Sequence, residues 1–209
     1  MVLASANPEK VAELRAILGD AIHLVARPPD VPEVVEDAAT FVGNARLKAA
    51  ALVAVTGLTA LADDSGLEVD ALDGAPGVRS ARYAGDSATD ADNVAELLAA
   101  LADHPDPADR RARFRCVVVL QRTDGTELVA DGTAEGHIAR SPRGAAGFGY
   151  DPVFIPDRPA RRAGDVAVDD RTFAELAPAE KHAVSHRGRA LAVLVAKLAD
   201  AAVSTIGRP

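Results

Sequence analysis

Short apolar runs alternate with stretches in which apolar residues recur every three or four positions, so strands and helices are expected to alternate. Residues 2–4 predict a buried strand, followed by a turn and then a helix that ends at Gly19. Asn7 is a good cap for that helix, and Pro8 suits its first turn, where no N–H is required. The chain therefore opens with a strand, a turn and a helix.

The same periodicity predicts the elements that follow. Residues 22–25 read as a second strand, and a proline-rich turn over 27–32 precedes a long helical pattern that Thr40 can cap. Residues 90–101 form an amphipathic pattern, and a polar, proline-broken loop follows at 103–113.

The second half of the chain mixes hairpin and helix signals. Residues 114–122 and 127–134 predict two strands joined by a tight turn. A short strand at 153–155, a helix from Pro178 and a last helix after an interruption at 185–189 complete the pattern. Antiparallel pairing beside strand–helix units predicts a mixed α/β fold.

Composition limits the classes of protein that remain. A chain of 209 residues with 48% hydrophobic residues fits one compact domain over 1–209. The net charge of −8 argues against general binding to nucleic acid or to an anionic membrane. The single cysteine, Cys116, lies in an apolar run and is interpreted as a core residue. Without a basic leader or a 20-residue apolar span, we expect a cytoplasmic protein.

The most informative stretch is ADDSGLEVDALDGAPGVRSARYAG, residues 62–85. Its adjacent carboxylates, Asp63 and Asp64, come directly after an apolar run and before Ser65-Gly66, where the backbone is able to turn sharply. Carboxylates held rigidly at the end of a buried strand are typical of a divalent-metal site. Glu36 lies in the loop just upstream of Thr40, and on sequence alone it is one of the chain's 31 acids, most of which are expected to be solvated.

The start of the first helix predicts an anion site. SANPEK, residues 5–10, places Lys10 beside the positive end of the helix dipole, which is unfavourable unless an anion binds there. The alternative is a solvated lysine on a surface helix.

Two further stretches offer groups able to bind a flat ring. GFGYDP, residues 147–152, lifts Phe148 between glycines, as either a stacking platform or a plug for the core. His186 and Arg187, at a glycine break between helices, are either donors to a ligand or a satisfied surface pair.

Taken together, these blocks resemble the inosine triphosphatase family, which includes the bacterial dITP/XTP pyrophosphatases. The resemblance runs in order along nearly the whole chain: SANPEK, Glu36 with Thr40, Phe41 and residues 44–48, then residues 62–85, GFGYDP, and EKHAVSHRGRAL at 180–191. It implies an elongated mixed-sheet fold with two lobes and a central cleft, usually a homodimer. It also implies Mg²⁺-dependent hydrolysis of noncanonical purine nucleoside triphosphates to the monophosphate and pyrophosphate.

The resemblance also assigns roles. Asp64 is the expected general base and a magnesium ligand, Glu36 is the second ligand, and Asp63 lies nearby as support. Lys10 is catalytic and binds phosphate together with its loop. The remaining residues expected to contact substrate are Ser5, Ala6, Asn7, Pro8, Glu9, Lys48, Ser65, Phe148, Gly149, Tyr150, Asp151, Lys181, His186 and Arg187. His186 and Arg187 are expected to donate to the O6 acceptor of hypoxanthine or xanthine, whereas adenine presents a donor there.

Two alternatives remain open. One is a Maf-like pyrophosphatase acting on pyrimidine or modified nucleotides, which should lack SHRG and GFGYDP. The other is a nucleotide-sensing module without turnover, against which the presence of Asp64, Glu36 and Lys10 argues. The segment 157–171 departs from the family pattern, because it is longer and more basic than expected. It reads as a mobile loop.

Overall fold

The computed structural model describes residues 1–19, 22–29, 31, 32, 34–157 and 170–206, with the backbone alone for 202–206. The contacts divide the chain into two compact units. The first unit comprises Met1–Ser65, Cys116–Gly132 and His186–Pro209, and the second comprises Gly66–Arg115 and Thr133–Ser185.

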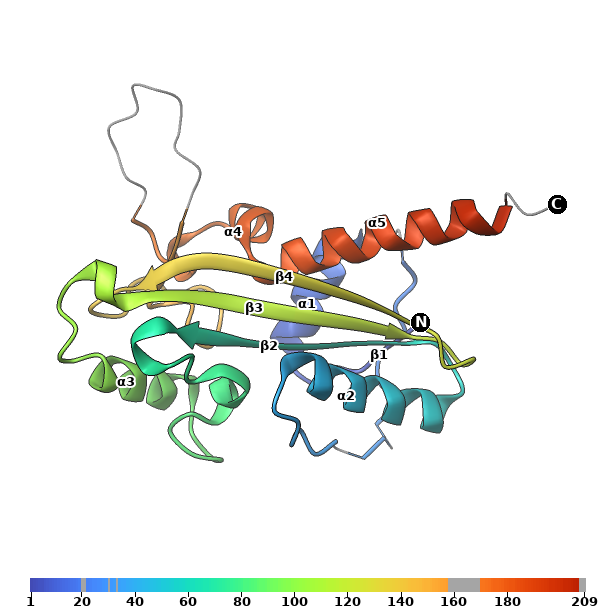
Figure 1. Ribbon diagram of the computed structural model, residues 1–209, viewed down its shortest axis with the longest axis horizontal. Helices are drawn as coiled ribbons and strands as arrows, with labels where there is room; N and C mark the ends of the chain where they lie inside the picture. Colours follow the sequence, from blue (N-terminus) through green and yellow to red (C-terminus); the bar gives the residue numbers. More distant parts are fainter. Residues whose placement is uncertain (20–21, 30, 33, 158–169, 207–209) are drawn as a thin grey trace, which may run out of the picture. The chain divides into compact units, whose positions relative to one another are not determined.

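Five strands form one sheet in the order β1-β2-β3-β4-β5 (Figure 1). β1 (Val2–Leu3) pairs in parallel with β2 (Ala60–Val69), and Val2 lies opposite Ala60. β3 (Arg111–Gln121) and β4 (Glu127–Ile138) are neighbours joined by a tight turn, and β5 (Phe154–Pro156) pairs antiparallel with the end of β4. The predicted mixed α/β fold is confirmed.

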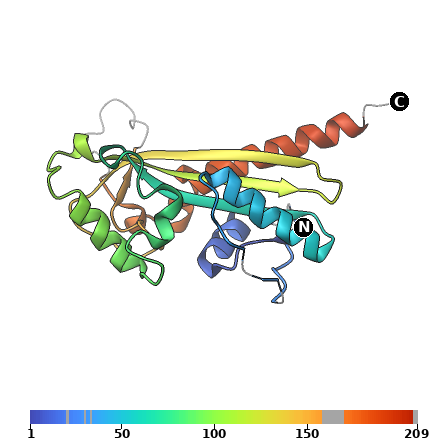
Figure 2. The same ribbon diagram turned by 60° about the horizontal axis from the view of Figure 1, so that its bottom comes forward.

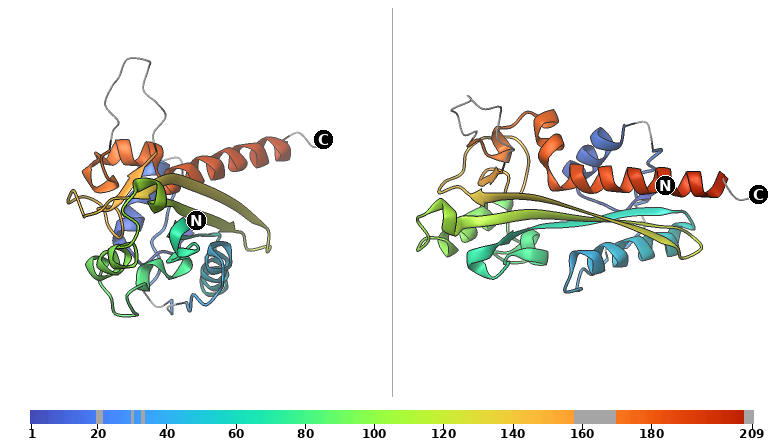
Figure 3. Two further views of the ribbon diagram at one scale, coloured as in Figure 1. Left: turned by 60° about the vertical axis from the view of Figure 1, so that its left-hand side comes forward. Right: turned by 45° about the horizontal axis from the view of Figure 1, so that its top comes forward.

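In the first unit, helices cover both faces of the sheet. α1 (Pro8–Leu18) and α5 (His186–Ile206) lie on one face and α2 (Phe41–Thr56) on the other (Figures 1 and 3; α2 lies in front of the sheet in Figure 2). The core beneath α1 and α5 contains Cys116, and burial raises the pKa of its thiol to about 12. The interpretation of Cys116 as a core residue is therefore confirmed.

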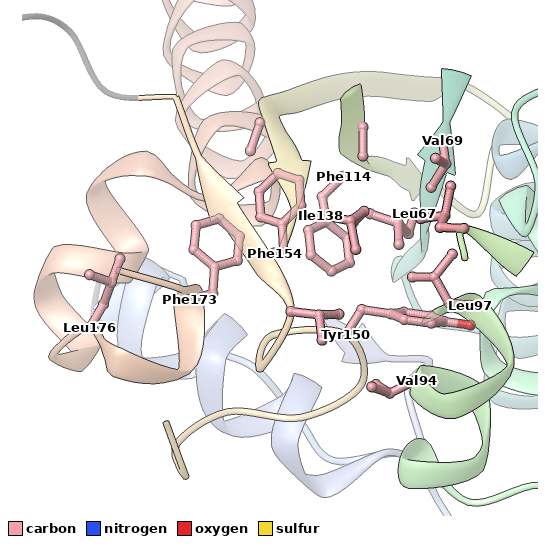
Figure 4. Packing of buried hydrophobic residues seen from close by; sticks show 14 residues of the cluster. Leu67, Val69, Val94, Leu97, Phe114, Ile138, Tyr150, Phe154, Phe173 and Leu176 are labelled. Atoms are coloured by element: carbon pink, nitrogen blue, oxygen red, sulfur yellow. The ribbon is translucent and has the colours of Figure 1, made fainter. Parts of the chain in front are cut away.

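The second unit is built on a core of aromatic and branched side chains. Phe154 lies 4.8 Å from Phe114 and 4.9 Å from Phe173, measured between ring centroids (Figure 4). α3 (Asp90–Ala100) buries Val94 and Leu97 in this core. The chain contains few aromatic residues, and it concentrates them here, where large rings fill space that aliphatic side chains alone would leave open.

Short helices complete the second unit. α4 (Pro178–Val184) precedes α5 in the chain. Four 3₁₀ helices are η2 (Asp70–Leu72), η3 (Gly77–Arg82), η4 (Pro107–Arg110) and η5 (Phe173–Glu175). Within the described part of the chain, no helix is both long enough and apolar enough to cross a membrane.

The local signals in the sequence are largely confirmed. The side chain of Asn7 accepts from the N–H of Lys10, Thr40 caps α2, and Gly19 follows α1. The hairpin is present, although β3 starts at Arg111 and β4 runs on to Ile138, further than predicted.

Three expectations are wrong. Residues 22–25 form no strand, because only Val25 makes a bridge, to Val2. Ser65-Gly66 makes no turn, because β2 continues through both residues to Val69. Gly188 does not break a helix but lies in the first turn of α5, and the interruption falls at Ser185. Residues 158–169 of the predicted mobile loop lie outside the described residues.

Candidate active site

Asp63 and Asp64 lie in the middle of β2, and both are buried, with 4% and 5% of their surfaces exposed. Successive side chains of a strand point to opposite faces of the sheet. Because α2 covers one face and α1 and α5 the other, the two carboxylates are expected to meet different helices. The contacts of the first unit agree with this expectation.

Asp64 meets two side chains of α2. Asn44 Nδ2 donates to Asp64 Oδ2 at 3.2 Å, and Lys48 Nζ donates to Asp64 Oδ1 at 3.0 Å. These residues are four positions apart, so they lie on one face of the helix. Asn44 Oδ1 also accepts from the N–H of Ala38 at 3.0 Å, which fixes the loop that carries Glu36.

Lys48 bridges two carboxylates. Its Nζ lies 3.1 Å from Glu36 Oε2 in addition to the contact with Asp64. Burial alone would lower the pKa of Lys48, but the charges of Asp64, Asp63 and Glu36 outweigh burial and raise it. Burial raises the pKa of Asp64, although the Lys48 ammonium opposes this. Asp64 is therefore a more basic carboxylate than an ordinary aspartate.

Asp63 meets cations from α1 and α5. Arg187 Nη2 lies 3.4 Å from Asp63 Oδ2 and 3.2 Å from Ser65 Oγ, and the same guanidinium pairs with Glu13 of α1 through Nη1. Lys10 Nζ lies 3.9 Å from Asp63 Oδ2. Burial alone would raise the pKa of Asp63, but Lys10, Arg187 and Lys48 outweigh burial and lower it. This carboxyl therefore stays ionised.

One carboxylate oxygen remains unsatisfied. Asp63 Oδ1 is buried and has no hydrogen-bond partner among the residues that the structure describes. Apart from the masked positions, the chain also holds no group of three or more His, Cys, Asp or Glu side chains arranged to bind a metal ion. Any metal held here must accordingly complete its coordination with ligands from outside the chain, such as phosphate oxygens and water.

The phosphate loop predicted at residues 5–10 leads into α1 and includes the first turn of that helix, in the first unit. Ser5 Oγ accepts from the N–H of Asn7 at 3.3 Å, and Asn7 Oδ1 accepts from the N–H of Lys10 at 2.9 Å, so the turn is ordered by its own side chains. A cavity of about 490 Å³ lies against Ser5 and Ala6, and Arg27 lines it too. The role of this loop in binding phosphate stays a prediction.

The aromatic loop, residues 147–151, belongs to the second unit. Phe148 is half-buried, whereas Tyr150 is buried, so Tyr150 is the residue of this loop that fills the core. Lys181 Nζ donates to Asp151 Oδ2 at 2.7 Å and lies 5.1 Å from the centre of the Phe148 ring. The ring thus has a cation at close range and part of its surface exposed to solvent.

His186 and Arg187 are buried rather than exposed. His186 begins α5 and is 5% exposed, and Arg187 is 1% exposed, so the alternative of a surface His–Arg pair is wrong. The guanidinium of Arg187 contacts Glu13, Asp63 and Ser65. Sequence reasoning missed Glu13 and Asn44. Their spacing was the available signal, since Glu13 lies three residues after Lys10 and Asn44 four before Lys48.

Comparison with known proteins places the chain in a family. The Ham1 family model matches residues 1–197, so the chain belongs to this family. It is 49% identical over 205 residues to a dITP/XTP pyrophosphatase of Yersinia pseudotuberculosis, covering 96% of this chain and 98% of that relative. A solved HAM1 protein of Coxiella burnetii is 46% identical, with a TM-score of 0.82 and coverage of 95% and 98%. The family membership predicted from the motifs is confirmed.

We predict that Arg187→Ala destabilises the fold, because it leaves the buried Asp63 without its closest cation. Removing one partner of a buried ion pair costs about 3–5 kcal/mol. Arg189→Ala is the matched control, because Arg189 lies on the same helix but is exposed, where an ion pair contributes at most about 1 kcal/mol, so a smaller loss is expected. Urea unfolding of both variants measures the difference. Equal free energies of unfolding would show that the pair does not hold the site together.

Proposed function

We propose that the protein hydrolyses noncanonical purine nucleoside triphosphates, namely ITP, dITP and XTP, to the monophosphate and pyrophosphate, and so cleanses the nucleotide pool. The observation that carries this proposal is the buried pair Asp63 and Asp64, with Lys10 and Lys48 beside it. It is supported by membership of the Ham1 family and by relatives of nearly the same length that are named dITP/XTP pyrophosphatases.

The first unit supplies the groups for phosphate chemistry. Asp64 accepts the proton of the attacking water at a carboxylate oxygen, and its raised pKa makes it a better base. Lys10 and the N–H groups at the start of α1 bind phosphate oxygens, because both carry positive charge. Such a site works mainly by positioning the water and the phosphate and by neutralising charge.

The residues present fit a magnesium ion. Glu36 and Asp64 both contact one cation, Lys48 Nζ, so their oxygens already converge on a positive charge. Mg²⁺ uses one or two carboxylates and completes its shell with phosphate oxygens and water. When bound, it would neutralise phosphate charge and make water easier to deprotonate. Glu36 and Asp64 would hold it.

The aromatic loop would bind the base. Phe148 offers a ring face for stacking, and Asp151 and Lys181 offer polar groups to the edge of a purine. His186 and Arg187 are proposed to favour an O6 acceptor over the amino group of adenine. We also propose that residues 1–209 act as one domain in a homodimer, in the cytoplasm and without nucleic acid or membrane as partners.

The function is tested by measuring pyrophosphate release from ITP, XTP, dITP, ATP, GTP and dTTP, each with and without Mg²⁺. ITP, dITP and XTP are expected to have the highest kcat/KM, and only with the metal. Preference for dTTP or another pyrimidine nucleotide would favour the Maf-like alternative. Tight binding of ITP without release of pyrophosphate would favour a sensing module.

Asp64→Asn is expected to abolish turnover of ITP while the fold remains. The carboxamide has the size of the carboxylate and still accepts from Asn44 or Lys48, but it cannot accept the proton of water. A loss of about 10²–10⁴-fold in kcat is expected from removal of a general base. A variant that melts near the wild-type temperature and keeps near-normal kcat would refute the assignment.

Lys48→Met is expected to increase the affinity for a divalent cation in the absence of nucleotide. In the metal-free protein, the ammonium of Lys48 occupies the place between Glu36 and Asp64 that a metal ion would take, so the ion must displace it. Removing this competitor should lower the Kd for Mn²⁺ by about tenfold, the effect of about 1.4 kcal/mol.

Titration calorimetry with Mn²⁺ measures the change. Arg46→Met is the control, since it removes one positive charge from the same helix at the exposed pair with Glu127. An equal gain in both variants would mean that overall charge, and not the position of Lys48, limits metal binding.

A further inference from the structure

Two successive backbone N–H groups in the aromatic loop are held by carboxylates. The N–H of Phe148 donates to Asp151 Oδ2 at 3.0 Å, and the N–H of Gly149 donates to Asp90 Oδ2 at 2.6 Å. Asp151 belongs to the loop itself, but Asp90 comes from 59 residues away in the chain. All of these residues lie in the second unit.

Asp90 is carried by a capped helix. It is the first residue of α3, whose N-terminus is closed by a capping box between Thr89 and Asp92. The helix buries Val94 and Leu97 in the core of the second unit. A carboxylate in the first turn of a helix is also stabilised by the helix dipole. The backbone that carries the acceptor for the Gly149 N–H is therefore held in place by the helix.

The loop is anchored on its other side by Tyr150. The Tyr150 hydroxyl donates to the carbonyl of Ser80 at 2.9 Å, and Ser80 Oγ accepts from the N–H of Leu67 at 2.9 Å. The ring of Tyr150 lies beside Val94 and Leu97 (Figure 4). Tyr150 is thus secured by burial and by a hydrogen bond, independently of Asp90.

Gly149 connects the anchored Tyr150 to the half-buried Phe148. Its φ of +59° is one that glycine adopts easily, and the space where a Cβ would lie is open, so no side-chain contact fixes it. The turn around it is closed from within by the N–H of Asp151, which donates to the carbonyl of Phe148 at 3.2 Å. The hydrogen bond from Gly149 to Asp90 ties this turn to α3, so without that bond the turn that carries the Phe148 ring would lose its link to the helix.

We infer that Asp90 is a positioning residue for the purine base: by holding the N–H of Gly149 it fixes the orientation of the Phe148 ring on which the base stacks. Asp90 touches neither the base nor the phosphates in this role. The inference rests on the proposed function for the identity of the ligand, and on the contacts of the loop for the role of Asp90.

The kinetic test uses Asp90→Ala, with Glu96→Ala as the matched control, because Glu96 is an exposed acid on the same helix and lies outside its capping box. Losing one hydrogen bond should raise the KM for ITP by about three- to tenfold, while kcat changes by less than about twofold, because stacking stabilises ground state and transition state alike. Asp90→Asn should restore part of the loss, since its carboxamide oxygen still accepts the bond. Equal KM values for Asp90→Ala and Glu96→Ala would overturn the inference.

A spectroscopic test reads the ring itself. The chain contains no tryptophan, so Phe148→Trp introduces a unique fluorophore at the stacking position. Adding Asp90→Ala should increase quenching by acrylamide and lower the anisotropy, whereas adding Glu96→Ala should change neither. If Phe148→Trp does not fold, hydrogen exchange of the 147–151 peptide in the single variants replaces it. Faster exchange in Asp90→Ala alone supports the inference, and equal exchange refutes it.

The two proposals fail in different ways. A wild-type protein that releases no pyrophosphate from any purine nucleotide would overturn the proposed function, while quenching and exchange would still decide whether Asp90 holds the loop. An active wild-type protein whose loop is indifferent to Asp90→Ala would overturn the role of Asp90 alone.

Discussion

The structure of the first unit depends on the burial of two adjacent carboxylates in one strand. Asp63 and Asp64 point to opposite faces of β2, so their closest cations come from different helices. Each face must bring its own positive charge: Lys48 from α2 on one, and Arg187 from α5 with Lys10 from α1 on the other. The three helices that cover this part of the sheet are thus also the carriers of its countercharges. Replacing α2 by a purely apolar helix would leave the buried Asp64 without its closest cation, Lys48.

The two carboxylates are kept in different states by their surroundings. Asp63 is held ionised by several cations, whereas burial raises the pKa of Asp64 in spite of Lys48. Neighbouring acids with diverging pKa values are a common way to separate a structural or electrostatic role from a proton-accepting one. This difference supports the proposal that Asp64 accepts the proton, while Asp63 contacts Lys10 and Arg187. A strand built for stability alone would carry apolar residues at both positions, because a buried ion pair seldom stabilises more than they do.

The sequence predicted the structural features that depend on residues close together in the chain. The caps at Asn7 and Thr40 act over three residues, and the helical periods and the hairpin turn are equally local. Residues 22–25 have the apolar character of a strand, but only Val25 pairs, because β1 offers two residues to pair with. Ser65-Gly66 looks like a turn in isolation, yet the ladder carries β2 through it. Glu13 could not be linked to Arg187 by spacing, since 174 residues separate them. The motifs identified the candidate residues, and the fold was needed to show what holds them.

The aromatic loop illustrates how glycine and carboxylate choices constrain each other. A Cβ on Gly147 would meet Asp151 Oδ2 at 2.0 Å, and the residue has a φ of +77°, so a side chain there would displace the carboxylate that holds Phe148 N–H and Lys181. Asp151 therefore approaches the loop backbone closely only because Gly147 leaves room for it. Gly149 differs, since the space beside its Cα is open and its N–H is bound by Asp90 from another element. The two glycines of the motif thus have different roles. Gly147 leaves room for the carboxylate of Asp151, and the N–H of Gly149 is bound by the carboxylate of Asp90.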